Sequence, residues 1–538
     1  MRVSKTSHQP LRRISALHRF YRGTGLFLWQ LNSGKSAIEL TSVADPWRGQ
    51  SVKGATILQA AESSDFDSMS EEFACFDWIR DVQEYGGSNA RIFVRTQLSR
   101  WMTRHSKWSE RYWRPDIMAR RISSLLFCYG WYGASASEEF QAHLAQFIAP
   151  QVRCLALDWQ RLRRTEDKIV CLSALILAQA MLGLSSSDKS QKRDMNALFA
   201  LLMPLLNSQI NDDGGHKSRQ PETHIRLLKR LVECRIALSH ANMQARPDLD
   251  DLIQKMASAT KIWRRSDGRF SHFNHAGGMS GAEIDQVLSM CVSKGRIPQY
   301  LNQTGFARLS AARTVAIIDT GAETLASDVI NPAGRFGFEL YVGSTPLIVN
   351  SGQYSPNESL TQALRQTVAH SALTLDNHDS DAITSAERTL TRACQVGAAE
   401  GGQLFEATHE GYLKSHGILH TRQIFLNKSG KDIRGRDKIS YTGAPGEIPR
   451  QLIIRFHLHP RVTAAQTATG QIILKVPKSS TSWHFKCRGA TGALEPSLYL
   501  DTGRRAHCQQ IVLSTGVTNI QTVGDAVVSW AFQNRKIT

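Results

Sequence analysis

The sequence predicts a multidomain chain, α first and β second: an incomplete (α/α) helical toroid followed by an antiparallel β-sandwich. From about residue 66 to 295, apolar residues recur at helical spacing between short connections rich in Gly, Ser, Asp and Pro. After about residue 300, short alternating segments with turn residues replace that pattern. The 538 residues, 41% of them hydrophobic, exceed one typical domain and can fill real cores. We expect a basic N-terminal strap at 1–65, the helical domain at 66–300 and the sandwich at 301–538.

The helical half is predicted from apolar stripes and their connections. Short links between long helical patterns favour stacked antiparallel helix pairs, and the lack of a fixed repeat favours an irregular toroid over a regular solenoid. Arg120 and Arg121 could line a groove there, or they could cap carbonyls and pair with acids. The later helical patterns occupy roughly 137–162, 165–183, 190–207, 221–242 and 247–263.

The strand half is predicted from short β-branched and aromatic runs. Gly, Asn and Asp separate them, which is typical of antiparallel sandwiches. The clearest runs are 314–321, 336–342, 347–350, 373–376, 451–459, 472–476 and 510–514.

Within the helical half, a cationic loop that carries a histidine and lies between two long helical regions is the strongest functional signal. Asp212-Asp213-Gly214-Gly215 predicts a turn, because Gly adopts positive φ at little cost and Asp bonds its own backbone. His216, Lys217 and Arg219 follow at once, and Pro221 then opens an amphipathic helix that contains His224. Loops held by a rigid scaffold often carry binding and chemistry. His224 itself is either a functional or a structural residue.

The charge balance favours anionic partners. The net charge of +18 suits nucleic acid, an acidic polysaccharide or a membrane surface. We expect no nucleic-acid partner, since the sequence has no zinc-finger spacing, no RNP-type aromatic motif and no basic heptad region. No apolar run has the ~18–20 residues that span a bilayer. The oligomeric state does not follow from the sequence.

Cysteine usage and the N-terminus bear on the compartment. The nine cysteines are scattered without a C-x-x-C pair, which favours buried free thiols in a reducing compartment. The N-terminus is basic, but its apolar stretch at 25–29 is too short for a signal peptide. We expect a cytoplasmic protein, with the periplasm or cell envelope as the alternative.

A series of motifs occurs in order along the chain. The motifs are Asp45-Pro46-Trp47-x-Gly49, Trp113-x-Pro115-Asp116 with Arg120-Arg121-Ile122, Asp213-Gly214-Gly215-His216-x-Ser218-Arg219, Ala369-His370-Ser371-x-Leu373-x-Leu375-Asp376, His409-Glu410-Gly411-Tyr412 with His420-x-Arg422, and Arg455-Phe456-His457-Leu458-His459-Pro460. No single motif is decisive, but together they span most of the chain, and in this order they resemble the heparinase II/III-like family of polysaccharide lyases. The resemblance implies the same toroid and sandwich, and an acidic polysaccharide or oligosaccharide as partner.

The resemblance implies β-elimination on a uronic-acid-containing glycan. A base removes the C5 proton, an acid protonates the leaving O4, and a donor stabilises the carboxylate as charge develops. His216 matches the family's His or Asn after the helical turn, and His370 matches the His of the sandwich, so these two are the predicted catalytic residues. Nearby cations would keep His216 neutral near pH 7. Arg219 could clamp a substrate carboxylate or pair with an acid of the chain, and Arg422 is a further substrate-binding candidate.

The sequence departs from the family at its catalytic Tyr. Many relatives carry Pro-x-Tyr-His after the Gly-Gly turn, and here Thr223 stands in the place of the Tyr. Either His272 or His275 substitutes, or Tyr341 or Tyr354 arrives from elsewhere, or the reaction is not elimination. His275 and Tyr354 are therefore predicted to contact substrate.

Other histidines and one basic run have two interpretations each. No cofactor follows from the sequence. Some relatives hold a divalent metal in the sandwich, and the spacing of His370, His409 and His420 would permit such a metal site here. Structural histidines are the alternative, and His457 and His459 share one strand face as packing residues. The basic run at 428–436 is a solvated hairpin or a contact for an anionic glycan.

The leading hypothesis is thus a lyase that cleaves an acidic polysaccharide. The alternative is a catalytically silent, anionic-glycan-binding or envelope-associated protein on the same scaffold. Nucleic-acid binding would rest on charge alone.

Overall fold

The structure is a computed structural model that forms two compact units. The helical unit runs up to Gln209 and resumes over Leu227–Ile253, and the sheet unit comprises Ile210–Arg226 and Gln254–Thr538. No helix in the described part of the chain is long and apolar enough to cross a membrane. The described residues are 11, 14–32, 38–63, 71–183, 187–274, 276, 278–291, 295–321, 332–352, 358–380, 391–477, 479–501 and 504–536.

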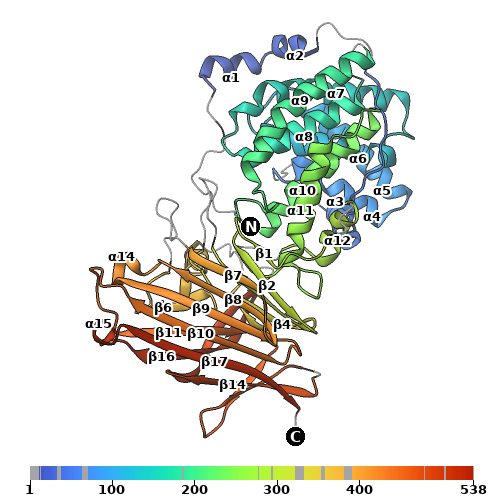
Figure 1. The fold of residues 1–538 in the computed structure, drawn as a ribbon. Coiled ribbons are helices and arrows are strands. Elements are labelled where there is room, and N and C mark those ends of the chain that lie inside the picture. Colours follow the sequence, from blue (N-terminus) through green and yellow to red (C-terminus); the bar gives the residue numbers. More distant parts are fainter. Residues whose placement is uncertain are drawn as a thin grey trace. The chain divides into compact units, whose positions relative to one another are not determined.

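Helices fill the chain before the first strand (Figure 1). They are α1 Ala16–Arg22, α2 Gly25–Asn32, α3 Ser51–Ser63, α4 Trp78–Tyr85, α5 Ser88–Arg104, α6 Pro115–Tyr132, α7 Glu138–Asp158, α8 Thr165–Met181, α9 Asp188–Gln209, α10 Pro221–His240, α11 Pro247–Thr260 and α12 Gly281–Ser289. Short 3-10 turns occupy Phe73–Cys75, Trp159–Arg161 and Lys261–Trp263.

Helix α6 shows why the helical unit packs as it does. Pro115 occupies its first turn, where a missing N–H costs nothing, and Asp116 complements the helix dipole. Both α6 and α8 are buried nearly all round, as expected for central helices, and α6 packs against α7 and α8.

Of the two interpretations of Arg120 and Arg121, the structure shows the one in which they bind carbonyls and pair with an acid. Arg121 is 1% exposed, and its guanidinium donates to the carbonyls of Ala74 and Tyr112 and to Gln151. Arg120 pairs with Asp77 at 2.5 Å. Both arginines therefore tie α6 to the segments packed around it.

Two antiparallel sheets follow the helices. One has the order β1-β2-β3-β4-β5-β11-β16-β15, with β6 also paired to β11, and the other has the order β12-β13-β14-β17-β10-β9-β8-β7 (Figure 1). Short helices α13 (Glu358–Ala363), α14 (Leu413–His416) and α15 (Ile520–Val523) and a 3-10 turn at Thr367–Ala369 connect strands. The strands are β1 Tyr300–Leu301, β2 Phe306–Ala311, β3 Thr314–Asp319, β4 Phe338–Val342, β5 Thr345–Val349, β6 Leu373–Leu375, β7 Thr391–Ala399, β8 Gly402–His409, β9 Ile418–Asn427, β10 Asp432–Tyr441, β11 Gln451–Leu458, β12 Thr463–Gln466, β13 Ile472–Lys475, β14 Thr481–Arg488, β15 Thr491–Asp501, β16 Arg504–Gly516 and β17 Asp525–Lys536.

The two sheets share one hydrophobic core. Phe338 and Phe456 of the first sheet pack on Trp530 of the second, and the Phe338 and Trp530 rings are stacked 5.5 Å apart. Gly435, opposite Trp530 in the register, makes room for the indole, because a Cβ there would lie 2.0 Å from the ring. The predicted order of helices and then an antiparallel sandwich is confirmed.

A buried carboxylate lies at the centre of this core. Asp437 accepts hydrogen bonds from Arg422 (2.6 Å), His420 (2.7 Å) and the Trp530 indole (2.8 Å), and Arg422 and Asp437 are both 0% exposed. Burial alone would raise the pKa of Asp437, but the charge of Arg422 and the bonds from Arg422 and His420 hold it well below its usual range. Asp437 is therefore ionised although it is buried in the core.

We predict that Asp437→Asn lowers the free energy of unfolding by about 3–5 kcal/mol, because it leaves the Arg422 charge buried without its partner. Asp432→Asn on the same strand removes the carboxylate that pairs with Arg434, an exposed arginine, and should cost about 1 kcal/mol or less. Urea unfolding of both full-length variants measures the difference. Equal losses would contradict the central role of Asp437.

Candidate active site

The cationic loop after Gln209 is held against the turn between β1 and β2. Asp213 accepts hydrogen bonds from the backbone N–H groups of Gln303 (2.9 Å) and Thr304 (2.8 Å) and from the Thr304 hydroxyl (2.7 Å). Gly214 has φ +83°, and a Cβ there would lie 2.4 Å from the Lys255 carbonyl oxygen. The predicted turn is thus a fixed element of the sheet unit.

His216 lies inside this turn and is 0% exposed. Its Nδ1 accepts a hydrogen bond from the backbone N–H of Ser218 at 3.0 Å and lies 2.8 Å from the Ser218 hydroxyl. Because the ring has no exposed edge, the geometry does not support direct contact between His216 and a polysaccharide, and its catalytic role stays a prediction.

Arg219 has a structural role, in place of the predicted contact with a substrate carboxylate. It is 4% exposed, its guanidinium donates to the carbonyls of Thr304 and Gly305, and it pairs with Asp319. The sequence alternative, in which Arg219 pairs with an acid of the chain, is the one observed. Arg422, engaged with Asp437 in the core, likewise has no exposed group for a substrate.

His370 packs against backbone that only glycine allows. A Cβ at Gly334 would lie 2.8 Å from the imidazole, and one at Gly337 would lie 3.3 Å from the His370 Cβ. The next residue, Ser371, donates its N–H to the Asn350 side chain at 3.2 Å, and Asn350 donates to the His272 carbonyl at 3.4 Å. One hydrogen-bonded path therefore connects the segment of His370 with His272.

The clearest arrangement for acid–base chemistry is a row of hydroxyl, imidazole and carboxylate. The Tyr499 hydroxyl lies 3.1 Å from His272 Nδ1, and His272 Nε2 lies 3.8 Å from Asp501 Oδ1. Tyr499 and Asp501 are two residues apart on β15, so both side chains lie on one face of the strand. Arg269 holds Asp501 with two bonds of 2.8 and 3.2 Å. A base with an orienting partner is the pattern that proton transfer requires.

Charge and burial set the protonation of this row. Burial, and then the charge of Arg265, lower the pKa of His272 to about 3, and burial raises the pKa of Tyr499. At neutral pH the tyrosine hydroxyl and the imidazole are therefore both neutral, and the other ring nitrogen of His272 faces Asp501. His272 and Tyr499 are buried, at 3% and 4% exposed. The side chains of Arg269 and Asp501 are 26% and 29% exposed, so the row is accessible to solvent at Asp501.

Glu339 fixes the backbone of the row through hydrogen bonds. It accepts hydrogen bonds from the N–H of His272 (3.0 Å), from the N–H of Asn350 (3.2 Å) and from the Tyr341 hydroxyl. Tyr341 is 2% exposed, so the candidate tyrosine from β4 is a buried partner of Glu339. The His459 ring packs edge-on against Tyr499 at 5.1 Å, so His459 borders the row. His457 is buried.

The structure adds Tyr499, Asp501 and Arg269 to the residues that the sequence indicated. His272 was one of the sequence candidates for the missing tyrosine. Tyr499 and Asp501 lie more than 200 residues further on, in a strand without a distinctive motif, so no sequence signal pairs them with His272. The predicted contacts His275 and Tyr354 lie outside the described residues.

The histidines of the sandwich do not fit a metal site. The Gly411 N–H donates to His409 Nδ1, and His409 Nε2 is 2.9 Å from His420 Nδ1. Since His420 Nε2 donates to Asp437, every ring nitrogen of the pair is used in a hydrogen bond. Among the described residues, no group of three or more His, Cys, Asp or Glu could hold a metal ion.

The architecture of helices followed by two antiparallel sheets is the heparinase III-like fold. The chain resembles a heparinase III gene product with a TM-score of 0.70 and 13% identity, over 98% of this chain and 92% of that chain. It also resembles heparinase III (TM-score 0.65, 14% identity, 88% and 79% covered) and the heparan sulfate lyase HepC of Pedobacter heparinus (0.63, 14%, 86% and 76%). At these identities the likeness shows the fold alone.

The second half of the sequence matches a family model. Residues 293–531 match the family model described as heparinase II/III-like, C-terminal, so the chain carries a heparinase II/III-like C-terminal domain. A curated relative, FtsZ-localized protein C of Caulobacter vibrioides, is 25% identical over 504 residues, which cover 88% of this chain and 86% of the relative.

His224 gives this unit a testable pH dependence. It is 0% exposed, its Nε2 lies 2.9 Å from the Met256 carbonyl, and burial lowers its pKa to about 4. In the unfolded chain the pKa is about 6.5, so between pH 6.5 and 4 the unfolded state binds more protons. This histidine therefore contributes a loss of stability, on the order of 3 kcal/mol, as the pH falls through that window.

We predict that His224→Gln flattens the decline of unfolding free energy between pH 6.5 and 4 by about that amount. Urea unfolding at a series of pH values measures it, and His143→Gln, at an exposed position of α7, is the control. An unchanged slope in His224→Gln would show that His224 is not held neutral.

Proposed function

We propose that this protein is a polysaccharide lyase that cleaves an acidic, uronic-acid-containing polysaccharide or oligosaccharide by β-elimination. The row of Tyr499, His272 and Asp501 is the observation that carries the proposal, because it provides a hydroxyl for proton transfer next to a neutral imidazole. The heparinase III-like fold and the net charge of +18 are consistent with an anionic glycan as substrate.

In the proposed reaction, the Tyr499 oxygen takes the C5 proton as its own proton passes to His272 Nδ1. The electrons of the C5–H bond form the C4=C5 double bond, the C4–O4 bond breaks, and O4 receives a proton from the same hydroxyl–imidazole pair. Asp501 faces the other ring nitrogen and stabilises the imidazolium that forms. Arg269, partly exposed beside it, is placed to meet the substrate carboxylate, and His370 is proposed as a second acid–base group.

We predict that Tyr499→Phe lowers kcat on a uronate glycan by roughly 10²–10⁴-fold, the usual contribution of a general acid–base group. The measurement is the ultraviolet absorbance of unsaturated uronyl products from a panel of uronate glycans. Tyr441→Phe, which alters a tyrosine at the end of β10 that bonds Gln521, is the matched control and should retain activity.

Two results would count against the lyase. One is the absence of absorbance with every glycan of the panel. The other is equal activity of wild type and Tyr499→Phe while both remain folded, which would move the chemistry away from this row.

A second candidate function is a catalytically silent, anionic-glycan-binding or envelope-associated scaffold. Two observations favour it: the substitution of the family's tyrosine by Thr223, and the relation to a protein named for its localisation with FtsZ over most of both chains. On this alternative, the deep burial of His272 and Tyr499 serves structure rather than turnover.

The scaffold candidate predicts that purified protein sediments with FtsZ polymers, binds acidic glycans and releases no unsaturated product. Sedimentation with and without FtsZ, combined with the absorbance assay, measures both properties. Turnover of any uronate glycan would dismiss the silent scaffold, and the absence of both FtsZ and glycan binding would also count against it.

A further inference from the structure

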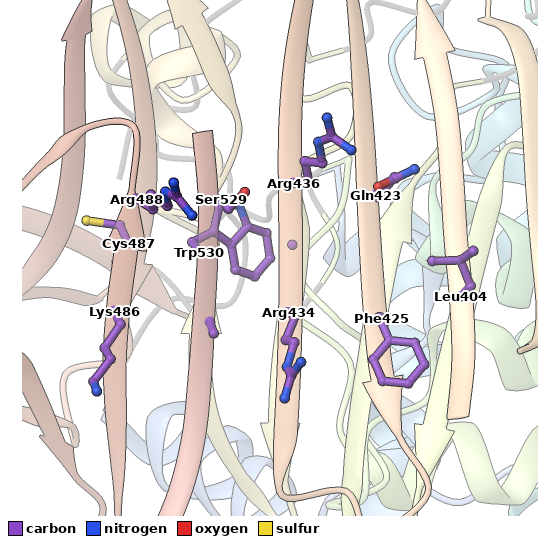
Figure 2. Close-up of a pocket in the computed structure, with 12 residues that line it drawn as sticks. Leu404, Gln423, Phe425, Arg434, Arg436, Lys486, Cys487, Arg488, Ser529 and Trp530 are labelled. Carbon is purple, nitrogen blue, oxygen red and sulfur yellow. The ribbon is translucent and has the colours of Figure 1, made fainter. Parts of the chain in front are cut away.

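A basic trough crosses the outer face of the second sheet, whereas Tyr499 belongs to β15 of the first sheet (Figure 2). The volume of the trough is about 410 Å³. Strand β17 forms the floor with small side chains, and β10 and β14 form the two sides, each with two cations. The register aligns them in two rows across the sheet, Arg434–Ala531–Lys486 and Arg436–Ser529–Arg488.

Most of this charge is not neutralised within the chain. Arg434 bonds Asp432 at 2.7 Å, whereas Arg436, Lys486 and Arg488 have no carboxylate within 4 Å among the residues that the structure describes. Residues two apart on a strand are separated by about 7 Å, and two strand spacings amount to about 10 Å. The four cations therefore stand at the corners of a rectangle of roughly those dimensions around the small floor residues.

The form of the trough indicates how a ligand is recognised. Strands β17 and β10 are paired on both sides along the trough, so a polypeptide cannot add to them as a further strand. Recognition must come from the cationic side chains and from the half-buried Phe425 and Leu404, which extend the row of Arg434 at one end (Figure 2). Arginine forks suit carboxylate and sulfate groups, and an aromatic face suits a sugar ring.

We propose that this trough is an accessory binding surface for an anionic oligosaccharide, with acidic groups on the cation rows and a sugar ring near Phe425. The inference rests on the proposed function for its class of ligand, but not on catalysis. The proposal also gives a function to the basic run at 428–436, whose role the sequence did not decide. Arg434 and Arg436 of that run lie on β10 and line the trough.

The test measures binding of a fluorescently labelled heparin octasaccharide by anisotropy at fixed salt. The variant Arg436→Ala/Lys486→Ala/Arg488→Ala should bind at least about tenfold more weakly, since three surface cations at about 0.5 kcal/mol each amount to a tenfold change. The control Arg100→Ala/Lys107→Ala/Lys189→Ala removes the same charge from exposed positions of the helical unit and should bind as wild type does.

The assay separates this proposal from the lyase. If wild type shows no lyase activity but binds the octasaccharide, and the trough variant loses that binding, the trough proposal is supported and the catalytic proposal is contradicted. Unchanged binding in the trough variant, equal weakening in the control, or no binding by wild type would overturn the trough. Tighter binding of polyglutamate or single-stranded DNA of equal charge would overturn the oligosaccharide as its occupant.

Discussion

The charge of Asp437, buried between the two sheets, is the constraint on which the sheet unit depends. Through Arg422 it reaches backbone next to the candidate site, because the same guanidinium donates to the carbonyls of Phe336 (2.8 Å) and Ser371 (3.0 Å). These carbonyls flank Gly337 and His370. A buried ion pair adds little net stability over an apolar core, but it penalises alternative packings in which either charge lacks a partner. Here it fixes the segment that carries His370.

The row of Tyr499, His272 and Asp501 depends on segments that are distant in sequence. His272 lies between α11 and α12, and its N–H donates to Glu339 of β4. Tyr499 and Asp501 come from β15, whose alternation places both on the face that meets His272. Burial keeps the imidazole neutral, and the partly exposed Arg269 and Asp501 leave one end of the row open to solvent. We therefore propose that proton transfer depends on Tyr499, which lies outside the local family motif.

Much of the fold follows from the sequence, because periodicity and turn chemistry are local. The change from helical spacing to alternation near residue 300 coincides with β1, which begins at Tyr300, and the Asp-Gly-Gly turn forms where it is expected. Ion pairs are not local. Arg219 could not be assigned from sequence alone, because its partner Asp319 lies 100 residues further on. For the same reason the sequence showed that the family's tyrosine is missing, but not that Tyr499 lies next to His272.

We propose that the Tyr499 hydroxyl and His272 move the C5 proton of a uronate. Proton NMR of a uronate oligosaccharide incubated with the protein in D₂O tests this proposal most directly, because the spectrum follows the C5 proton itself. We expect wild type to cause loss of the C5–H signal, by exchange with solvent or by formation of the C4=C5 double bond, and Tyr499→Phe to leave the signal unchanged. A C5–H signal that persists with wild type across acidic glycans, or that disappears equally with folded Tyr499→Phe, would contradict it.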